Sequence, residues 1–367
     1  MTLLLPEPPP GHLPSPSGPR VEHYPPASWT NVPRGLWASL VQRLPWQNAL
    51  FHQPALADKL RLLAPQADLV LLQLARLAGY ESALSGTPFA VDLIDSLALN
   101  FERRSELEKW CLRPLFQQEA GRLRRCESRL INRAQGVLVV CQRDRQSMLA
   151  AGVSRDADRV KVLPLAFPLG GAPAEVRASS DSEEPQDFSQ QTLVLTGNLG
   201  YFPTVDGFCW WLQEVWPRLH DRRPDLRVLA AGSRPARRLR RAIREAPGFV
   251  ELIASPPDLR AVLEQGTVAM APMRSGSGQP LKILEAWEAG IPVVASPWAA
   301  AGTAGQGNGA LFVADEPAEW AELLLDLLDD AQKRAQMVAQ GRLQLSESYD
   351  REKLQQGWRD WALSLLP

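Results

Sequence analysis

The stretch from Arg274 to Ser296, "RSGSGQPLKILEAWEAGIPVVAS", contains four consecutive signals that together indicate a fold. A turn rich in glycine and serine leads into an amphipathic helical segment, a Gly-Ile-Pro sequence ends that segment, and a short β-branched strand follows. A glycine-rich turn that enters a helix can bind an anion, because free backbone N–H groups and the positive end of the helix dipole face the ligand. Dipole and capping contacts alone contribute roughly 0.3 to 1 kcal/mol at a surface, so a charged side chain is needed as well.

Two charged side chains in this helical segment suit a nucleoside diphosphate. Lys282 is one of only six lysines in a chain whose other basic residues are arginine, and its compact ammonium suits a diphosphate. Glu285 follows three residues later on the same helical face, where its carboxylate could accept the hydroxyls of a ribose. The backbone amides of four loop residues are expected to bind the same diphosphate, namely those of Ser275, Gly276, Ser277 and Gly278. An ordinary βα loop with both side chains in solvent stays open, because the loop matches neither G-x-G-x-x-G nor the P-loop pattern.

Bulk composition limits the possible classes of protein. With 367 residues and 45% apolar content, the chain is long enough for two domains of about 150 residues each. The formal net charge of −1 argues against a dedicated nucleic-acid binder. Four cysteines without C-x-x-C spacing and only four histidines indicate neither a disulfide framework nor a zinc site, so we expect the cysteines to be reduced interior residues.

The apolar stretches of the sequence are too short for a signal peptide or a membrane span, which bears on the expected cellular location. The three leucines Leu3 to Leu5 are cut short by prolines and have no basic region ahead of them. No apolar stretch reaches the roughly 18 residues that a membrane span needs. We therefore expect a cytoplasmic protein, with contact to the inner face of the plasma membrane left open.

Strands alternate with helices along both halves of the chain, which indicates βα units and parallel sheets covered on both faces. In the first half we expect strands at 67–74, 87–95, 135–142 and 159–167 and helices at 36–44, 54–63 and 101–134. In the second half we expect strands at 192–200, 225–232, 249–254, 266–273 and 310–315 and helices at 205–219, 234–246, 257–266, 317–328 and 351–366. Between the halves, the composition changes to Gly, Pro, Ser and acidic residues without apolar periodicity.

The predicted organisation is therefore two Rossmann-like domains and a linker. The N-terminal domain is expected at 1–168, the linker at 169–191, and the C-terminal domain at 192–350. The remaining residues, 351–367, form a predicted helix that could pack back on the N-terminal domain.

Two ordered motifs resemble those of a known enzyme family. "APMRSGSGQPLKILEAWEAGIPVVAS" is similar to the C-terminal-domain signature of family 4 (group 1) glycosyltransferases with the GT-B fold, in which a turn precedes K-x-L-E-A-x-x-x-G-x-P-V-V. "LTGNLGYFPTVDGFCWWLQEVWP" resembles the opening of the same domain in a bacterial branch linked to exopolysaccharide gene clusters. The likeness covers residues 192 to about 350 well and residues 45–165 more loosely.

The resemblance implies two parallel-sheet domains that face each other across a cleft, and a C-terminal domain that binds a UDP- or GDP-sugar. Carried over to this chain, Glu285 holds the ribose, Lys282 and the loop amides hold the diphosphate, and Gly197 with Asn198 approaches the donor. Family members need no metal, because the helix dipole and basic side chains stabilise the leaving phosphate. The resemblance thus predicts a retaining, metal-independent hexosyltransferase whose acceptor is a glycan or a lipid-linked sugar and which has no cofactor beyond its nucleotide-sugar substrate.

The chain departs from the family pattern at three places. Ser277 replaces the first glutamate of the common Glu-x7-Glu motif, and Ile94 with Asp95 stands where many members carry a histidine. Asp95 and Ser96 are the expected substitutes for acceptor and sugar contacts, with Asp95 as a catalytic candidate; helix capping by Asp95 is the alternative.

The third departure concerns the N-terminus, which lacks the usual first strand, Gly-rich loop and helix. Leu3 to Leu5 is then either the second strand of the usual pattern, with Val21 to Tyr24 as the third, or a first strand that has lost its helix; we favour the former. We expect a start codon placed too late or a poorly ordered N-terminal half, and an in-frame stop upstream would refute the first idea.

Other features leave further functions open. The arginine-rich segments 121–133 and 233–246 could attract anionic lipid head groups, or be solvated helix faces. Helical spacing indicates that Trp210, Trp211 and Trp216 pack in the core rather than bind sugar. A noncatalytic nucleotide-sugar-binding subunit and a GT-B sugar 2-epimerase remain alternatives to the transferase. The sugar, the base, the acceptor and the oligomeric state do not follow from the sequence.

Overall fold

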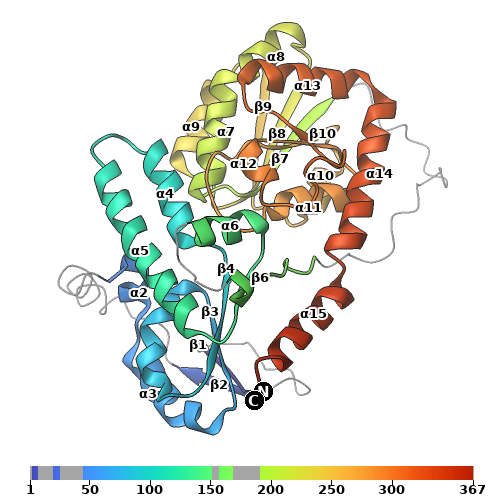
Figure 1. Ribbon diagram of the computed structural model, residues 1–367. Helices are drawn as coiled ribbons and strands as arrows, with labels where there is room; N and C mark the ends of the chain where they lie inside the picture. The colour runs from blue at the N-terminus through green and yellow to red at the C-terminus, as the bar shows by residue number, and fades with distance from the viewer. Residues whose placement is uncertain (1, 7–19, 25–43, 151–156, 168–190, 367) are drawn as a thin grey trace. The chain divides into compact units, whose positions relative to one another are not determined.

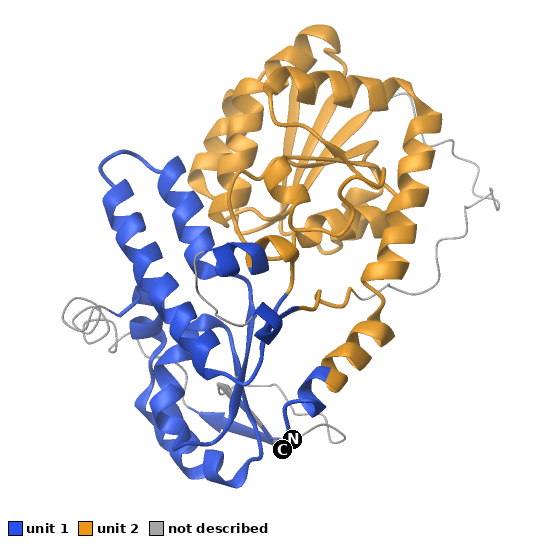
Figure 2. Cartoon of the chain, viewed as in Figure 1, with its two compact units in different colours: residues 1–139, 145–161, 361–367 blue, residues 140–144, 162–360 orange. Residues whose placement is uncertain are grey.

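The computed structural model describes residues 2–6, 20–24, 44–150, 157–167 and 191–366. The chain divides into two compact units, coloured separately in Figure 2. Unit 1 comprises residues 1–139, 145–161 and 361–367, and unit 2 comprises residues 140–144 and 162–360. The chain thus passes between units four times, because the segment 140–144 belongs to unit 2 and the last helix is shared. The predicted linker 169–191 lies outside the described residues except for Gln191, as does the predicted helix 36–44 except for Leu44.

Unit 2 contains a six-stranded sheet in the order β12-β11-β10-β7-β8-β9, in which every pair is parallel (Figure 1). Its strands are β7 (Thr192–Asn198), β8 (Arg227–Ser233), β9 (Phe249–Ala254), β10 (Val268–Ala271), β11 (Val293–Ala295) and β12 (Phe312–Val313). From β7 the chain moves outward to β8 and β9, and it then returns to β10 on the other side of β7. The direction of winding therefore reverses between β7 and β10, which is where ligands bind in open parallel sheets.

Helices cover both faces of this sheet. They are α7 (Phe202–Glu214), α8 (Trp216–Arg222), α9 (Arg237–Glu245), α10 (Leu259–Leu263), α11 (Leu281–Ala289), α12 (Pro297–Ala300), α13 (Pro317–Asp329) and α14 (Ala331–Ser348). The last helix, α15 (Arg351–Leu363), contributes none of its described residues to the core on either face. Alternate strand residues point to opposite faces. In β7, Leu193 and Leu195 therefore join the core beneath α7, α8, α9 and α13, whereas Val194 joins the core beneath α10, α11, α12 and α14.

The tryptophans of unit 2 are largely core residues, as their spacing predicts. Trp211 and Trp216 are completely buried and stack on each other with ring centroids 6.0 Å apart. Trp210 is partly buried against the same core. The prediction of core packing is confirmed for Trp211 and Trp216.

Unit 1 contains two sheets. The first pairs β1 (Thr2–Pro6) with β2 (Arg20–Tyr24) in parallel, and the second has the order β3-β4-β5-β6, in which the first two pairs are parallel. The members of the second sheet are β3 (Val70–Gln73), β4 (Phe89–Ile94), β5 (Val137–Val139) and β6 (Val160–Val162). Within the described ranges, no strand of the first sheet is hydrogen-bonded to a strand of the second. The strands predicted at Leu3–Leu5 and Val21–Tyr24 are present and are parallel.

The helices of unit 1 differ from the prediction at one place. They are α2 (Trp46–Phe51), α3 (Pro54–Leu63), α4 (Leu97–Leu107), α5 (Arg113–Arg133) and α6 (Gln142–Ala150), with 3-10 turns at Ala64–Gln66, Ala75–Leu84 and Ala157–Arg159. The first three residues of α6, 142–144, belong to unit 2. The prediction of one helix over 101–134 was wrong, since α4 and α5 are separate helices packed on each other. Pro114 explains the break, because proline is accepted in the first turn of a helix but not in its interior.

In unit 2 the helix predicted at 205–219 is likewise two helices, α7 and α8, each with a proline in its first turn. The 18-residue helix α14 was not predicted from the sequence at all. Its buried residues are few and its exposed positions many, so its apolar periodicity is weak.

The cysteines follow the expectation with one exception. All four are free thiols, and Cys126, Cys141 and Cys209 are buried, but Cys111 is exposed in the break between α4 and α5. The prediction that all four lie in the interior is therefore wrong for Cys111.

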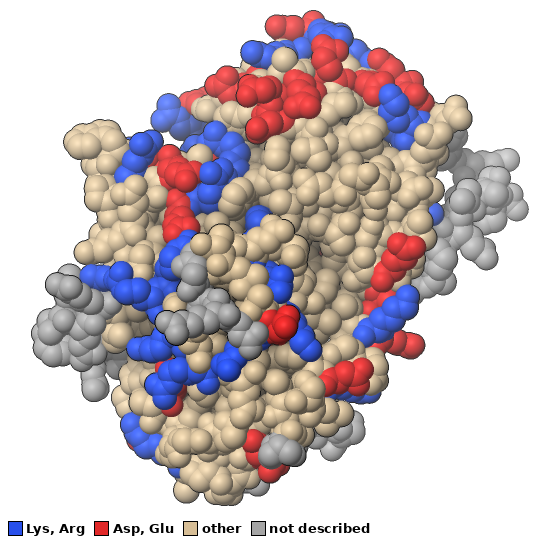
Figure 3. All heavy atoms as spheres, viewed as in Figure 1, with Lys and Arg blue, Asp and Glu red and all other residues tan. Residues whose placement is uncertain are grey.

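Surface charge is mixed over two helices of unit 2. Figure 3 shows acidic and basic side chains interspersed over α8 and α13. Two ion pairs, Arg222 with Glu322 and Arg223 with Asp329 at 2.8 Å, join these helices. Across the described parts of the chain, no helix combines the length and the apolar character that crossing a bilayer requires.

Candidate functional site

The candidate site is built where β7 and β10 end, at the reversal of winding in the sheet of unit 2. The turn after β7 leads into α7, and the loop after β10 leads into α11, which begins at Leu281. Because the carboxyl ends of parallel strands lie at one edge of a sheet, both connections emerge at the same edge. The structure thereby brings together residues of the two sequence motifs, which are about 80 positions apart.

Lys282 lies over the end of β7. A Cβ atom placed on Gly197 would be 3.5 Å from the Lys282 Cε and 3.7 Å from its Nζ, and Gly197 has a φ of +127° that other residues rarely adopt. The ammonium donates a hydrogen bond to Thr204 Oγ1 at 3.1 Å, at the start of α7. Burial lowers the pKa of Lys282 from 10.5 to about 8, against the opposing effect of the nearby Glu285 carboxylate. The lysine is thus a partly desolvated cation, which a bound anion would stabilise.

Glu285 carries an unsatisfied acceptor beside this cation. The Thr196 hydroxyl, near the end of β7, hydrogen-bonds the carboxylate, while Oε2 is buried without a hydrogen-bond partner. Burial raises the pKa of Glu285, and Lys282 counteracts that effect. A buried carboxylate oxygen without a partner is costly, and a ligand hydroxyl would satisfy it.

The loop between β10 and α11 is mostly buried, and its glycines adopt left-handed φ angles, +108° at Gly276 and +72° at Gly278. Gly276 lies against the start of α7, since a Cβ atom there would be 3.3 Å from Pro203. The Ser275 hydroxyl is buried and has no hydrogen-bond partner. The Gly278 amide, however, already donates to Asp144 Oδ2 at 2.8 Å. Of the four predicted amides, that of Gly278 is therefore engaged within the protein, and Asp144 prevents it from meeting a phosphate in this conformation.

Asn198, the last residue of β7, and Arg274, which follows β10, form hydrogen bonds within the protein. Asn198 Oδ1 accepts the backbone N–H of Gly200 at 3.0 Å, which closes the turn after β7. Arg274, the first residue of the glycine-rich loop, donates two hydrogen bonds to Asp206 Oδ2, at 2.8 and 3.2 Å, and lies over the Trp210 ring. A buried carboxylate in α7 thus anchors the start of the loop after β10.

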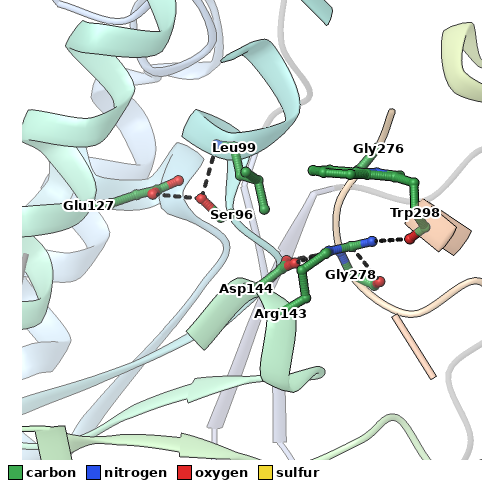
Figure 4. A network of polar contacts seen from close by, with 8 residues as sticks. All are labelled: Ser96, Leu99, Glu127, Arg143, Asp144, Gly276, Gly278 and Trp298. Atoms are coloured by element: carbon green, nitrogen blue, oxygen red, sulfur yellow. Dashed lines mark hydrogen bonds and ion pairs between the residues drawn. The ribbon is translucent and has the colours of Figure 1, made fainter. Parts of the chain in front are cut away.

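Asp95 belongs to unit 1, where it follows β4. Its N–H donates to the Leu93 carbonyl at 2.6 Å, and Ile94 has a positive φ of +60°. The N-cap of α4 is Ser96, which accepts the Leu99 N–H, so the alternative that Asp95 caps this helix is wrong (Figure 4).

Ser96 is less suited to contact a substrate than its sequence position indicates. Its hydroxyl also donates to Glu127 Oε2 at 3.0 Å, and Glu127 accepts the Ala98 N–H with its other oxygen. Burial raises the pKa of Glu127 to about 7. Glu127, which sequence reasoning did not select, therefore supports the start of α4 from within unit 1.

The residues that sequence reasoning missed at the candidate site are Thr196, Thr204, Asp206, Asp144 and Arg143. Thr196, Thr204 and Asp206 lie inside the quoted motif, but none was selected as a site residue. Asp144 and Arg143 contact the loop from 134 and 135 positions away in the sequence. No local spacing signals such partners.

Comparisons with known proteins agree with this arrangement. The family model for glycosyl transferases group 1 matches residues 190–330. An uncharacterized 44.6 kDa protein in the cps region of Klebsiella pneumoniae is 25% identical over 174 residues, which are 46% of this chain and 45% of that protein. The match thus spans about half the length of this curated relative.

Solved structures with the same fold include proteins in complex with UDP or UDP-glucose. Anabaena Alr3699/HepE in complex with UDP-glucose has a TM-score of 0.64 and 17% identity, over 94% of this chain and 86% of that chain. A mutant of S. aureus TarM, solved in complex with fondaparinux, α-GlcNAc-glycerol and UDP, has a TM-score of 0.60 and 14% identity, over 85% of this chain and 58% of TarM. The predicted fold class is confirmed. The chain therefore has the GT-B fold, and its residues 190–330 are similar to the glycosyl transferases of group 1.

Proposed function

We propose that this protein transfers a sugar from a UDP- or GDP-linked donor to a glycan or lipid-linked acceptor in cell-envelope or exopolysaccharide synthesis. The observation that carries the proposal is the pairing of Lys282, a partly desolvated cation, with the unsatisfied Glu285 oxygen at the reversal point of the sheet. A nucleoside diphosphate supplies both complements, phosphate for the ammonium and ribose hydroxyls for the carboxylate. The group 1 match over the same residues supports this pairing.

In this proposal the diphosphate lies against Lys282 and the loop residues Ser275 to Ser277, with Gly197 and Asn198 on its other side. As the bond from sugar to phosphate breaks, negative charge grows on the leaving diphosphate, and the ammonium stabilises that charge without a metal ion. The transfer retains the anomeric configuration, as the family resemblance implies. Asp95 is proposed as the acceptor-side carboxylate.

The relatives support parts of this proposal. The HepE and TarM structures were solved with UDP-glucose and with UDP, which favours a uridine nucleotide. The location of the Klebsiella relative in a cps region favours a role in surface polysaccharide synthesis.

The experiment compares wild-type protein with Lys282→Met in calorimetric titrations of UDP and GDP and in transfer assays with their sugars. We expect Lys282→Met to weaken nucleotide affinity by roughly ten- to a hundredfold, since a hydrogen bond to a charged group contributes about 1.5 to 3 kcal/mol. Lys333→Met is the matched control, because it removes a lysine of α14 that pairs with Asp326. Equal affinities for wild type and Lys282→Met would count against the proposal.

Two other functions are outcomes of the same assays. Ser277 occupies the position of a glutamate that contacts the donor sugar in many relatives, which favours a noncatalytic binding subunit. Nucleotide binding without sugar release from any donor would support that alternative. Conversion of a free nucleotide sugar without acceptor would instead indicate a sugar 2-epimerase.

Peripheral contact with the cytoplasmic membrane face is proposed for α9. Its arginines at 237, 238, 240, 241 and 244 are all exposed, although Arg238 and Arg241 also form ion pairs. Each basic residue near an anionic surface contributes about 1 kcal/mol. We expect the protein to sediment with vesicles that contain phosphatidylglycerol more than with neutral vesicles, and reversal of charge at residues 237, 240 and 244 to abolish the difference. Equal sedimentation with both vesicle types would remove this contact.

A further inference from the structure

The loop between β10 and α11 is bonded to a segment 134 positions earlier in the chain. Asp144, fully buried, accepts the Gly278 N–H at 2.8 Å, and Arg143 Nη2 donates to the Gly278 carbonyl at 3.0 Å. Both backbone polar groups of Gly278 are therefore held by two consecutive side chains of unit 2. Since Gly278 has a φ of +72°, these bonds fix a backbone conformation that other residues rarely adopt.

Arg143 extends this contact to a second glycine through Trp298. Its Nη1 donates to the Trp298 carbonyl at 2.7 Å, and its guanidinium lies 4.9 Å from the centre of the indole ring. The indole Nε1 in turn donates to the Gly276 carbonyl at 2.8 Å. Figure 4 shows Arg143, Asp144 and Trp298, here called the loop clamp, around the two glycines.

The carboxylate of the loop clamp is itself fixed in place. Arg143 Nε donates to Asp144 Oδ1 at 3.1 Å, which leaves Oδ2 for the Gly278 amide. The Cys141 thiol also forms a hydrogen bond with Asp144. Truncating Asp144 would leave the buried Gly278 amide and the Arg143 Nε without their acceptor, whereas asparagine keeps one oxygen that can accept the Gly278 amide.

The loop clamp bonds the backbone on both sides of Ser277, just ahead of the helix that carries Lys282. Gln279, between the clamp and α11, forms two further bonds with the Leu165 backbone, at 3.1 and 3.3 Å. The backbone just before Lys282 is therefore held by several side chains. Two of them, Arg143 and Asp144, lie outside both sequence motifs. Small displacements of a binding group cost large factors in rate, so such supporting residues matter to a site they do not touch.

We propose that Arg143 and Asp144 are positioning residues of the nucleotide site, which act by holding the loop 274–278 in the conformation that places Lys282 and the amides of Ser275 to Ser277 for a diphosphate. This inference rests on the proposed function of the same site. It assigns a positioning role to a dipeptide in the segment 140–144, outside the region that matches the group 1 family.

The test uses the full chain in four forms: wild type, Asp144→Ala, Asp144→Asn, and Asp330→Ala as control. Asp330 is an N-cap in the same unit that accepts the Lys333 N–H at 2.8 Å, so its loss removes one carboxylate-to-amide bond at the start of α14. UDP and GDP are titrated into each form by calorimetry, and hydrogen exchange is followed in peptides that cover residues 274–280.

We expect Asp144→Ala to exchange faster in these peptides and to bind nucleotide about ten- to a hundredfold more weakly. Asp144→Asn should recover most of the affinity, and Asp330→Ala should change neither quantity.

The outcomes separate this inference from the proposed function. Faster exchange in Asp144→Ala with unchanged nucleotide affinity would overturn the positioning role, as would equal loss of affinity in Asp144→Ala and Asp330→Ala. Failure of Asp144→Asn to bind better than Asp144→Ala would also overturn it. A wild-type protein that binds neither UDP nor GDP would overturn the proposed function, and the positioning role with it.

Discussion

At the scale of single residues, the candidate site depends on a lysine that is costly to bury. Its pKa of about 8 means that a sizeable fraction is uncharged just above neutral pH. A surface lysine would keep its charge but would interact more weakly with a phosphate in high dielectric. Partial burial thus strengthens the contact with the diphosphate and narrows the pH range in which it forms.

The first prediction follows from this pKa. Below about pH 8 the free protein already carries the charged ammonium, and above it the proton must be taken up on binding. Affinity for UDP should therefore fall as pH rises through 8, by nearly tenfold per further pH unit, while the Lys282→Met variant should show no such slope. Calorimetric titration at several pH values measures both slopes. A wild-type affinity that stays constant up to about pH 10 would show that the ammonium is not a ligand for the phosphate.

At the scale of elements, the helices around the site are held by contacts that no local sequence pattern indicates. Helix α14 packs on α11 through Gly341, where a Cβ atom would lie 2.5 Å from Trp287 Cδ1. Trp287 is completely buried and donates its indole N–H to the Ala310 carbonyl at 2.8 Å. Because Trp287 and the site residues Lys282 and Glu285 share α11, the helix that carries the candidate site is anchored by this contact.

A substitution at Gly341 tests that anchor. Alanine gains about 1 kcal/mol in intrinsic helix propensity, but overpacking against a rigid indole costs about 1 to 3 kcal/mol. The steric cost should win, so Gly341→Ala should lower the free energy of unfolding by up to about 2 kcal/mol. Urea denaturation measures this, with the exposed Gln336→Ala in the same helix as control. A stabilised Gly341→Ala protein would mean that α14 does not pack against the Trp287 indole as described.

At the scale of the whole molecule, two units with separate cores are expected to unfold in separate steps. Unit 2 contains the proposed donor-site residues named above, among them Gly197, the loop 274–278, Lys282 and Glu285. A ligand that binds the folded state at 100 times its dissociation constant stabilises that state by about 2.7 kcal/mol.

Nucleotide should therefore act on one unfolding step. We expect UDP or GDP at that concentration to raise the melting temperature of the step that unfolds unit 2 by about 5 to 10 °C, and to leave the other step unchanged. Differential scanning calorimetry resolves the two steps, and Lys282→Met should abolish the shift. A shift of the other step alone would place the nucleotide site in unit 1.

Sequence patterns by themselves determined the fold class, most strands, and the two motifs whose residues meet at the site. They did so because strand and helix periodicity, glycine turns and a lysine-glutamate spacing are all local properties. They misjudged the helix over 101–134, where Pro114 starts a second helix, and Cys111, which is exposed at that break.

Only the tertiary structure decided which groups are already bonded. Asp206 binds Arg274 from 68 positions away, and Asp144 takes the Gly278 amide that the local pattern assigned to phosphate. The N-cap of α4 is Ser96, with Glu127 behind it, and not Asp95. The physical reason is that a polar group removed from water bonds whatever partner the packing brings near, and packing joins residues without regard to their distance in sequence.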